Sequence, residues 1–427
     1  MTTTTKLAGN GLMAAALSVV LPLAANAASV TIDSVTQRWP WNNKVDIAYT
    51  VTDAQDHEQG AYYGLRFSLA ANGQTYEFEG CMIGASAESG SGSRRHTATW
   101  TAPAGIVCAD ATLTATLFPT NVPSGNDYMI VDLDSGAVFY EGLFASQADS
   151  NARYNTAEYK TDKLVLRKVP RTAESGDLPN GPFANGYPTG DTVLFSSGND
   201  KNTSHNWTTD RDYYIGVFLV TQYQYQKLYG SNPSLDTTPI TGNEITHRPV
   251  ENVSWKELRT DISASAAIPT ASAFTGTFFQ RLNFRTGLYF DLPTEVMYEI
   301  ATRAGATTIY SWGNAMDEDY VVCSENAGGS TVAVGSRLPN AWGLYDTAGN
   351  LWDRTRDTRD TIDMAGRPDA FTPGVGSSGQ ASRIRLRSGH HKLSSSHNYF
   401  RASQRDCTCS TSDKGDEVGF RVAIIPQ

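Results

Sequence analysis

The sequence predicts an α+β protein of two domains, an N-terminal antiparallel β-sandwich followed by a loop-rich domain with few short helices. Three alternating runs of apolar and polar residues, typical of half-buried strands, lie in the first part of the chain: Val45–Val51, Tyr63–Leu69 and Thr112–Leu117. Later segments instead show short helical patterns between long stretches rich in Gly, Asn and Ser. With 427 residues, 40% of them hydrophobic, the chain can bury more than one core. Its formal charge of -10 argues against a nucleic-acid partner.

The first 27 residues have the pattern of a secretory signal peptide. Lys6 is their only charged residue, Leu12–Leu23 is a short apolar run, and Ala25-Asn-Ala27 is a small-residue cleavage site. The apolar run is too short to span a bilayer comfortably, and no other stretch is apolar enough for a membrane helix. The sequence therefore predicts a protein without a membrane span that is exported and is periplasmic, on the cell surface or secreted.

The five cysteines fit an oxidising compartment. Cys81 and Cys108 lie in the first domain, and we expect them to form a disulfide. One thiol among Cys323, Cys407 and Cys409 is then left over unless it binds a metal. The pair Cys407-Thr-Cys409 could hold a soft metal such as Cu(I). Alternatively, one member of the pair is a structural half-cystine, with Cys323 as its candidate partner.

Several further elements follow from local patterns. Met129–Leu133 can add a strand, and Lys163–Val169 alternates as a strand does. We then expect a strand at Asp212–Val220, followed by a helix capped by Thr221. A second helix is capped by Ser254, with Glu257 three residues on, and a third ends at Leu282–Gly287. An amphipathic helix is expected over Thr294–Arg303, with Val296, Met297 and Ile300 on its buried side. Beyond Ala304 we expect mostly loop.

The segment Asn340–Asp357 fits neither a helix nor a strand. The spacing of its aromatic residues matches neither a period of 3.6 nor one of 2. Glycines interrupt it, and short polar side chains alternate with the large apolar ones: Asp346, Asn350 and Asp353 against Trp342, Leu344, Tyr345 and Trp352. The pattern predicts an irregular loop whose rings are buried and whose oxygens face an ion or the backbone.

This segment is one of six ordered motifs: Asp212–Thr221, Arg248–Trp255, Leu292–Glu299, Tyr310–Asn314, Asn340–Asp357 and Gly419–Val422. In this order the motifs resemble the sulfatase-modifying factor family, which includes the formylglycine-generating enzymes. The resemblance covers roughly Lys163–Ala423 and implies a C-type-lectin-like fold that is poor in regular structure. We therefore divide the chain into a signal peptide (1–27), a β-sandwich domain (28–120), a connector (121–160) and a sulfatase-modifying-factor-like domain (161–427).

The resemblance also implies one calcium site in the Asn340–Asp357 segment. Its ligands would be a side-chain oxygen of Asp346 together with groups of Thr347, Gly349 and Leu351. Calcium takes about six to eight oxygen ligands and mixes carboxylates with carbonyls, so Asp346 suits this role. The alternative is that Asp346 caps a turn through backbone amides.

Catalysis by a family enzyme requires a cysteine pair that this chain lacks at the matching place. The resemblance implies two cysteines, with four residues between them, that hold Cu(I) and activate oxygen. The corresponding segment Arg387–Arg401 contains no cysteine, and Cys407 and Cys409 lie beyond Arg405 with another spacing. Copper and formylglycine synthesis are therefore not expected, and a non-catalytic member is favoured. The competing hypothesis is a copper-dependent oxidase whose ligands have moved to Cys407 and Cys409.

The polar C-terminal segment is instead a candidate binding surface, because Ser, His and Tyr make adaptable contacts. We expect an extracellular protein or glycan ligand, bound by Trp352, Arg387, His390, His391, Ser394, His397, Tyr399, Arg401 and Arg405. The histidines are interpreted as surface or pocket-lining residues rather than iron ligands.

A further hypothesis concerns the origin of the same segment. Some relatives are variable proteins of diversity-generating retroelements, in which adenines are rewritten. Rewriting the first two bases of an Asn codon yields His, Ser, Tyr, Phe, Asp, Cys or Thr. These residue types dominate at His390, His391, Ser394–Phe400, Ser403 and Cys407–Ser412. The alternative is a divergent polar loop, and the binding role is compatible with both.

Overall fold

The computed structural model describes residues 2–6, 29–37, 44–52, 62–71, 73–79, 93–102, 111–120, 125–171, 183–185, 205–207, 209, 211–238, 247–259, 276–358, 370–373, 383–396, 398–406 and 409–424. Most of the expected signal peptide lies outside these ranges, as do Cys81, Cys108, His397 and Cys407. The chain divides into two compact units, Met1–Ser150 with Phe284–Gly287, and Asn151–Asn283 with Leu288–Gln427. The expected α+β class is confirmed, because sheets predominate in the first unit and a few short helices occur in the second.

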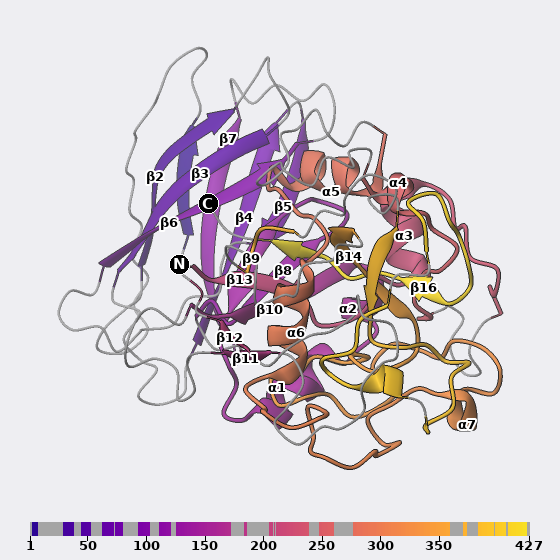
Figure 1. Ribbon diagram of the computed structural model, residues 1–427. Coiled ribbons are helices and arrows are strands. Elements are labelled where there is room, and N and C mark those ends of the chain that lie inside the picture. The colour runs from indigo at the N-terminus through magenta and orange to yellow at the C-terminus, as the bar shows by residue number, and fades with distance from the viewer. Residues whose placement is uncertain are drawn as a thin grey trace. The chain divides into compact units, whose positions relative to one another are not determined.

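The first unit is built from antiparallel sheets (Figure 1). Its strands are β1 (Thr2–Lys6), β2 (Ser29–Gln37), β3 (Lys44–Thr52), β4 (Tyr62–Ala71), β5 (Gln74–Glu79), β6 (Ser93–Thr101), β7 (Thr112–Thr120), β8 (Tyr128–Asp132) and β9 (Val138–Glu141). One sheet has the order β1-β7-β4-β5 and another the order β2-β3-β6, while β8 and β9 form a hairpin. The three alternating runs thus lie in β3, β4 and β7 as expected, and the added strand is β8.

Alternation along these strands produces one core. In β3 the residues Val45, Ile47 and Tyr49 are buried at every second position, as the pleat of a strand requires. They belong to the same hydrophobic cluster as Leu65 and Leu113 of the other sheet. Two sheets therefore share one apolar interior. That they form a β-sandwich domain stays a prediction.

The second unit contains short strands and helices joined by long connections. Its strands are β10 (Lys163–Val169), β11 (Phe183–Asn185), β12 (His205–Trp207), β13 (Tyr213–Gly216), β14 (Trp352–Thr358), β15 (Ile384–Arg387), β16 (Val418–Gly419) and β17 (Ala423–Ile424). Its helices are α2 (Glu158–Thr161), α3 (Gln222–Tyr229), α4 (Trp255–Leu258), α6 (Glu295–Arg303) and α7 (Ser324–Ala327). Strand β13 lies between β10 and β17, and β14 lies between β15 and β16.

The predicted helix caps are confirmed. The Thr221 hydroxyl accepts a hydrogen bond from the Gln224 N–H, and the Gln224 side chain returns a bond to the Thr221 N–H. Ser254 and Glu257 form the same reciprocal arrangement at the start of α4. Helix α5 (Phe278–Thr286) ends where the sequence predicts. These signals are local, since each cap satisfies orphan N–H groups within one turn of the backbone.

Local patterns miss three features of secondary structure. Helix α1 (Gln147–Tyr154) lies within the expected connector, and Ser146 accepts the Asp149 N–H as a cap does. Helix α6 buries Val296, Met297 and Ile300 as expected, but its six other residues, including the charged ones, are buried as well. Trp352–Thr358 is not loop but the fully buried strand β14. In each case tertiary packing, rather than an apolar period, stabilises the element.

None of the helices within the described ranges has the length and apolar character needed to cross a membrane.

Candidate functional site

The central loop of the second unit is fixed to helix α6 by one side chain. The side-chain amide oxygen of Asn340, Oδ1, accepts hydrogen bonds from the N–H groups of Trp342 and Leu344, both at 3.0 Å. The Asn340 amide nitrogen donates to the backbone oxygens of Ala301 and Thr302, at 2.8 and 2.9 Å. These carbonyls belong to the last turn of α6, which leaves such groups without helical partners. Asn340 therefore defines where the loop begins.

Four residues of this loop, Gly343 among them with a φ of 81°, adopt the left-handed backbone conformation. Asp346 and Asn350 have φ values of 52° and 63°, and Gly349 has a φ of 83°. A Cβ atom at Gly349 would lie 2.0 Å from the backbone oxygen of Val322, so only glycine fits there. Asn350 bonds both ways to the Val332 backbone, with 3.2 Å for each contact. The Asn350 side chain thus connects the turn to the backbone of the preceding segment at Val332.

A buried arginine holds the other side of the turn. Arg421 is fully buried and donates to Asp353 Oδ2 at 3.0 Å. It also donates to the backbone oxygens of Gly216, Tyr345 and Asp346, at 3.1, 3.2 and 3.0 Å. Burial raises the pKa of Asp353 to about 6, although the Arg421 guanidinium acts in the opposite direction. One guanidinium therefore joins β13, the loop, β14 and the C-terminal segment.

Three of the four residues expected to bind calcium, Asp346, Thr347 and Gly349, accept hydrogen bonds from protein donors. The Asp346 carboxylate accepts the Gly335 N–H at 2.8 Å and the Asn350 amide at 3.2 Å. The backbone oxygen of Thr347 accepts the Tyr298 hydroxyl at 3.4 Å, and that of Gly349 accepts the Ser388 hydroxyl at 3.2 Å. Such hydrogen bonds are also what is expected if Asp346 caps a turn through backbone amides. The calcium site stays a prediction.

Two predicted ligand-binding arginines form a buried ion-pair network with helix α6. Arg387 Nη2 donates to Glu299 Oε2 at 2.6 Å, and Arg405 Nε donates to Glu295 Oε1 at 3.0 Å. Arg303 pairs with Glu299 at 2.9 Å, one turn away on the same helix. Glu295, Glu299 and Arg387 are 0% exposed, so water does not screen these charges. These two arginines therefore pair with buried carboxylates and do not form part of a solvent-exposed binding surface.

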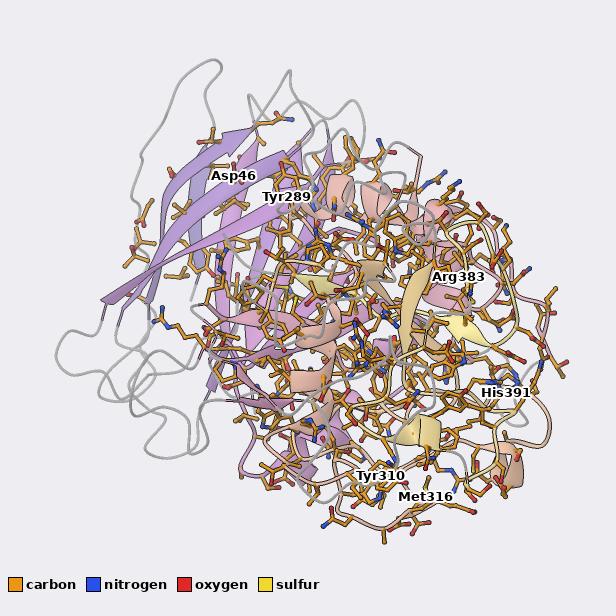
Figure 2. All side chains as sticks on the ribbon, viewed as in Figure 1. Asp46, Tyr289, Tyr310, Met316, Arg383 and His391 are labelled. Carbon is orange, nitrogen blue, oxygen red and sulfur yellow. The ribbon has the colours of Figure 1, made fainter. Side chains whose placement is uncertain are left out.

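Two of the predicted histidines, His390 and His391, lie in a largely buried cluster of rings beside Trp352. The Trp352 ring contacts Tyr399 edge-on, with 5.4 Å between centroids, and lies 5.9 Å from the His390 ring. His391, labelled in Figure 2, has its Nδ1 3.0 Å from the backbone oxygen of Asn350. His390 Nε2 lies 3.8 Å from a carboxylate oxygen of Glu417. Burial lowers the pKa of His390 to about 4 and also lowers that of His391, so both rings are neutral at pH 7.

Exposed parts of the predicted surface are confined to a short loop. We call Lys392–Ser396 with Asn398 and Tyr399 the contact loop; its residues are exposed or half-buried. The Ser394 hydroxyl and the Ser395 N–H donate to the Glu325 carboxylate at 2.6 and 2.9 Å. Lys392 pairs with Asp416 at 2.8 Å. Lys392 and the middle of the loop are thus held in place, while Ser396 is exposed and Tyr399 half-buried.

The described cysteines have different surroundings. Cys323 is a fully buried free thiol, and burial together with the neighbouring Glu325 raises its pKa to about 11. Cys409 is half-buried and interacts electrostatically with the guanidinium of Arg354. Cys323 thus lies near a negative charge and Cys409 near a positive one.

The structure thus separates the predicted site residues into two groups. Trp352, Arg387, His390, His391, Arg401 and Arg405 are buried, whereas Ser394 and Tyr399 reach the surface. Sequence reasoning missed Glu295 and Glu299 as partners and Glu325 as an anchor. The first two stand four residues apart in an otherwise apolar helix pattern, which is a detectable signal for a buried charged face. No comparable signal marks Glu325.

Comparison with known proteins agrees with this scaffold. The sulfatase-modifying factor enzyme 1-like domain matches residues 163–425, more than half of the chain. The chain belongs to this family. The predicted resemblance is therefore confirmed.

Individual relatives can be compared with this family member. The formylglycine-generating enzyme of Streptomyces coelicolor is 33% identical over 149 residues, and this match covers 31% of the chain and 46% of that protein. Treponema denticola variable protein 1 gives a TM-score of 0.47 at 23% identity, over 62% of this chain and 96% of that one. PvdO from Pseudomonas aeruginosa gives a TM-score of 0.45 at 21% identity, over 61% of this chain and 94% of that one.

The ion-pair network makes a prediction about the stability of this family domain. Replacing Arg387 with Met should lower the free energy of unfolding by about 3–5 kcal/mol, because it leaves the Glu299 carboxylate buried with one partner fewer. Urea titration followed by circular dichroism measures this change. The matched control is Lys392→Met, which removes an exposed cation and should cost about 1 kcal/mol or less. Equal losses in the two variants would contradict a structural role for Arg387.

His390 makes the stability depend on pH. Its pKa in the folded chain, about 4, is below the ordinary value of 6.5, so the unfolded chain binds the proton more readily. Its stabilising contribution is therefore fully present above pH 6.5 and is lost as the pH falls towards 4, with a limit of about 3 kcal/mol. In His390→Gln, the free energy of unfolding should fall less steeply between these pH values. Parallel pH profiles for the two proteins would show that His390 is not responsible.

Proposed function

We propose that this chain is an exported ligand-binding protein whose sulfatase-modifying factor domain presents the contact loop to an extracellular protein or glycan. The observation that carries the proposal is the combination of a maintained scaffold with a segment Arg387–Arg401 that contains no cysteine. Arg387 and Arg405 are held by the carboxylates of α6, so the segment between them has a defined course. A rigid frame around a polar, accessible loop is suited to recognition.

The chemistry of the contact loop supports adaptable polar binding. Its exposed or half-buried polar groups are the Lys392 ammonium, serine hydroxyls, the Asn398 amide and the Tyr399 ring. Ser, Asn and Tyr form adaptable contacts with many partners at low entropic cost. Tyr399 is supported from behind by Trp352. A hydroxyl-bearing glycan and a protein surface both fit this set.

Formylglycine synthesis by displaced cysteines is less well supported. Cys407 and Cys409 are separated by one residue, whereas the resemblance to the family's enzymes implies a copper-binding pair with four residues between its members. The chain also matches 46% of the curated enzyme, so the activity of that enzyme is not transferred with the fold.

The hypothesis of retroelement diversification fits only part of the proposed positions. Ser394, Ser395 and Tyr399 are accessible, so substitutions there would change the surface without disturbing the core. His390 and Ser403 are buried, at 7% and 1% exposure, and substitutions there would disturb packing. We therefore propose diversification only for the contact loop and not for buried positions such as His390 and Ser403.

An oxidation assay separates the binding protein from the oxidase. We expect copper-loaded protein to leave a cysteine-bearing sulfatase peptide unchanged, as read by mass spectrometry, because Arg387–Arg401 supplies no thiolate pair. The formylglycine-generating enzyme of Streptomyces coelicolor serves as the positive control. Conversion of the peptide cysteine, abolished by joint replacement of Cys407 and Cys409 with Ser, would refute the non-catalytic proposal.

Binding should depend on the contact loop. For a glycan or protein ligand recovered from an array screen, Tyr399→Ala and Ser396→Arg should each weaken affinity by about tenfold or more, because one removes a ring and the other adds bulk. Surface plasmon resonance measures the dissociation constants. Ser336→Arg, at another exposed position of the same unit, is the control and should bind normally. Unchanged affinity in both loop variants would place the binding site elsewhere.

A further inference from the structure

A half-buried aromatic surface lies beside the contact loop. Tyr310, Trp312 and Tyr320 form a continuous stack, with 4.9 Å between successive centroids and interplanar angles of 12° and 11°. Figure 2 labels Tyr310 and Met316, which belong to the same cluster. We call the partly buried members of this cluster the aromatic ledge: Ile309, Trp312, Met316, Tyr320 and Leu393.

The ledge extends further across the surface. Leu338 is 51% exposed, and its N–H donates to the backbone oxygen of Asp319 at 2.8 Å, next to Tyr320 in the chain. Large apolar side chains that gather at a surface, rather than scatter singly, indicate an interaction site. The stacked rings are rigid, so little conformational entropy is lost when a partner covers them.

Carboxylates without protein counter-charges border the ledge. Asp317, Glu318, Asp319 and Glu325 are exposed, and none forms a salt bridge with another residue in the described ranges. Ligand oxygens of Glu318 and Glu325 lie within 4.8 Å of each other and of the Cys323 sulfur. Hydrogen bonds from Ser394 and Ser395 lower the pKa of Glu325 to about 2, so it is ionised. Two adjacent negative charges without a counter-ion attract a cation.

The ledge and the contact loop are continuous. Leu393 is a member of both, and its backbone oxygen accepts the Ser324 N–H at 2.9 Å. Glu325 receives the bonds from Ser394 and Ser395 on one side and approaches Glu318 on the other. A ligand that covers the contact loop would therefore meet this acidic, aromatic border.

We propose that the ledge docks a basic segment of a protein partner, with a Lys or Arg side chain between Glu318 and Glu325 and an apolar side chain over Trp312 and Tyr320. The proposal rests on the proposed ligand-binding function and names the chemistry of the partner. An ammonium or guanidinium group satisfies several carboxylate oxygens through its N–H donors. A metal ion fits less well, because the Cys323 thiol holds its proton and would have to lose it.

The test uses the full chain and a fluorescein-labelled peptide of alternating Lys and Leu. Its partner peptide has Glu in place of Lys. By fluorescence anisotropy at physiological salt, the Lys peptide should bind and the Glu peptide should not. Glu318→Lys should weaken binding by about tenfold, since it replaces attraction by repulsion. Glu158→Lys, the same charge change at an exposed carboxylate of the same unit, should change the affinity less than about twofold.

Several results would overturn the proposal. Equal weakening by Glu158→Lys would show general attraction to a chain of net charge -10. Binding that needs added zinc and disappears with EDTA would show a metal site at Glu318 and Glu325 instead. Failure of the Lys peptide to bind would exclude a basic partner. A ligand that depends on Tyr399 but not on Glu318 would refute the ledge and leave the proposed function in place.

Discussion

Two buried carboxylates on one short helix, Glu295 and Glu299, determine much of the arrangement of the second unit. A carboxylate removed from water is costly unless cations and donors surround it, so both must be paired for the helix to be buried. Their partners Arg387 and Arg405 come from β15 and from the segment that follows it. Because these contacts fix both ends, the intervening chain must follow a defined course across the domain.

This constraint divides the polar C-terminal segment into two parts with different roles. Near its ends the side chains are buried and form ion pairs or pack against Trp352, so they maintain the fold. Between them, the contact loop is held by backbone and serine bonds to Glu325, which leaves most of its side chains accessible. A scaffold of this kind tolerates changes in the loop without loss of stability. The sequence of the contact loop can therefore vary while the frame around it is maintained.

The same principle applies to the turn around Asp346. Its left-handed residues and the close approach at Gly349 require specific side chains, and Arg421 joins the turn to three other segments. Such a turn is stabilised by many small contacts rather than by regular backbone ladders. Long connections leave many backbone N–H and C=O groups without partners in helices or sheets. Buried charged side chains such as Arg421 form hydrogen bonds with these groups, so the unit can contain both.

The sequence alone determined the features that depend on neighbouring residues. Alternation located β3, β4 and β7, capping residues located α3 and α4, and six ordered motifs identified the family. Tertiary structure decided which polar residues are buried, because Arg387 or His390 has the same local pattern whether it faces water or a carboxylate. It also decided that Trp352–Thr358 is a strand, since a fully buried strand needs partners that are distant in the chain. The segment proposed for binding could thus be chosen from the sequence, but which of its residues are accessible could not.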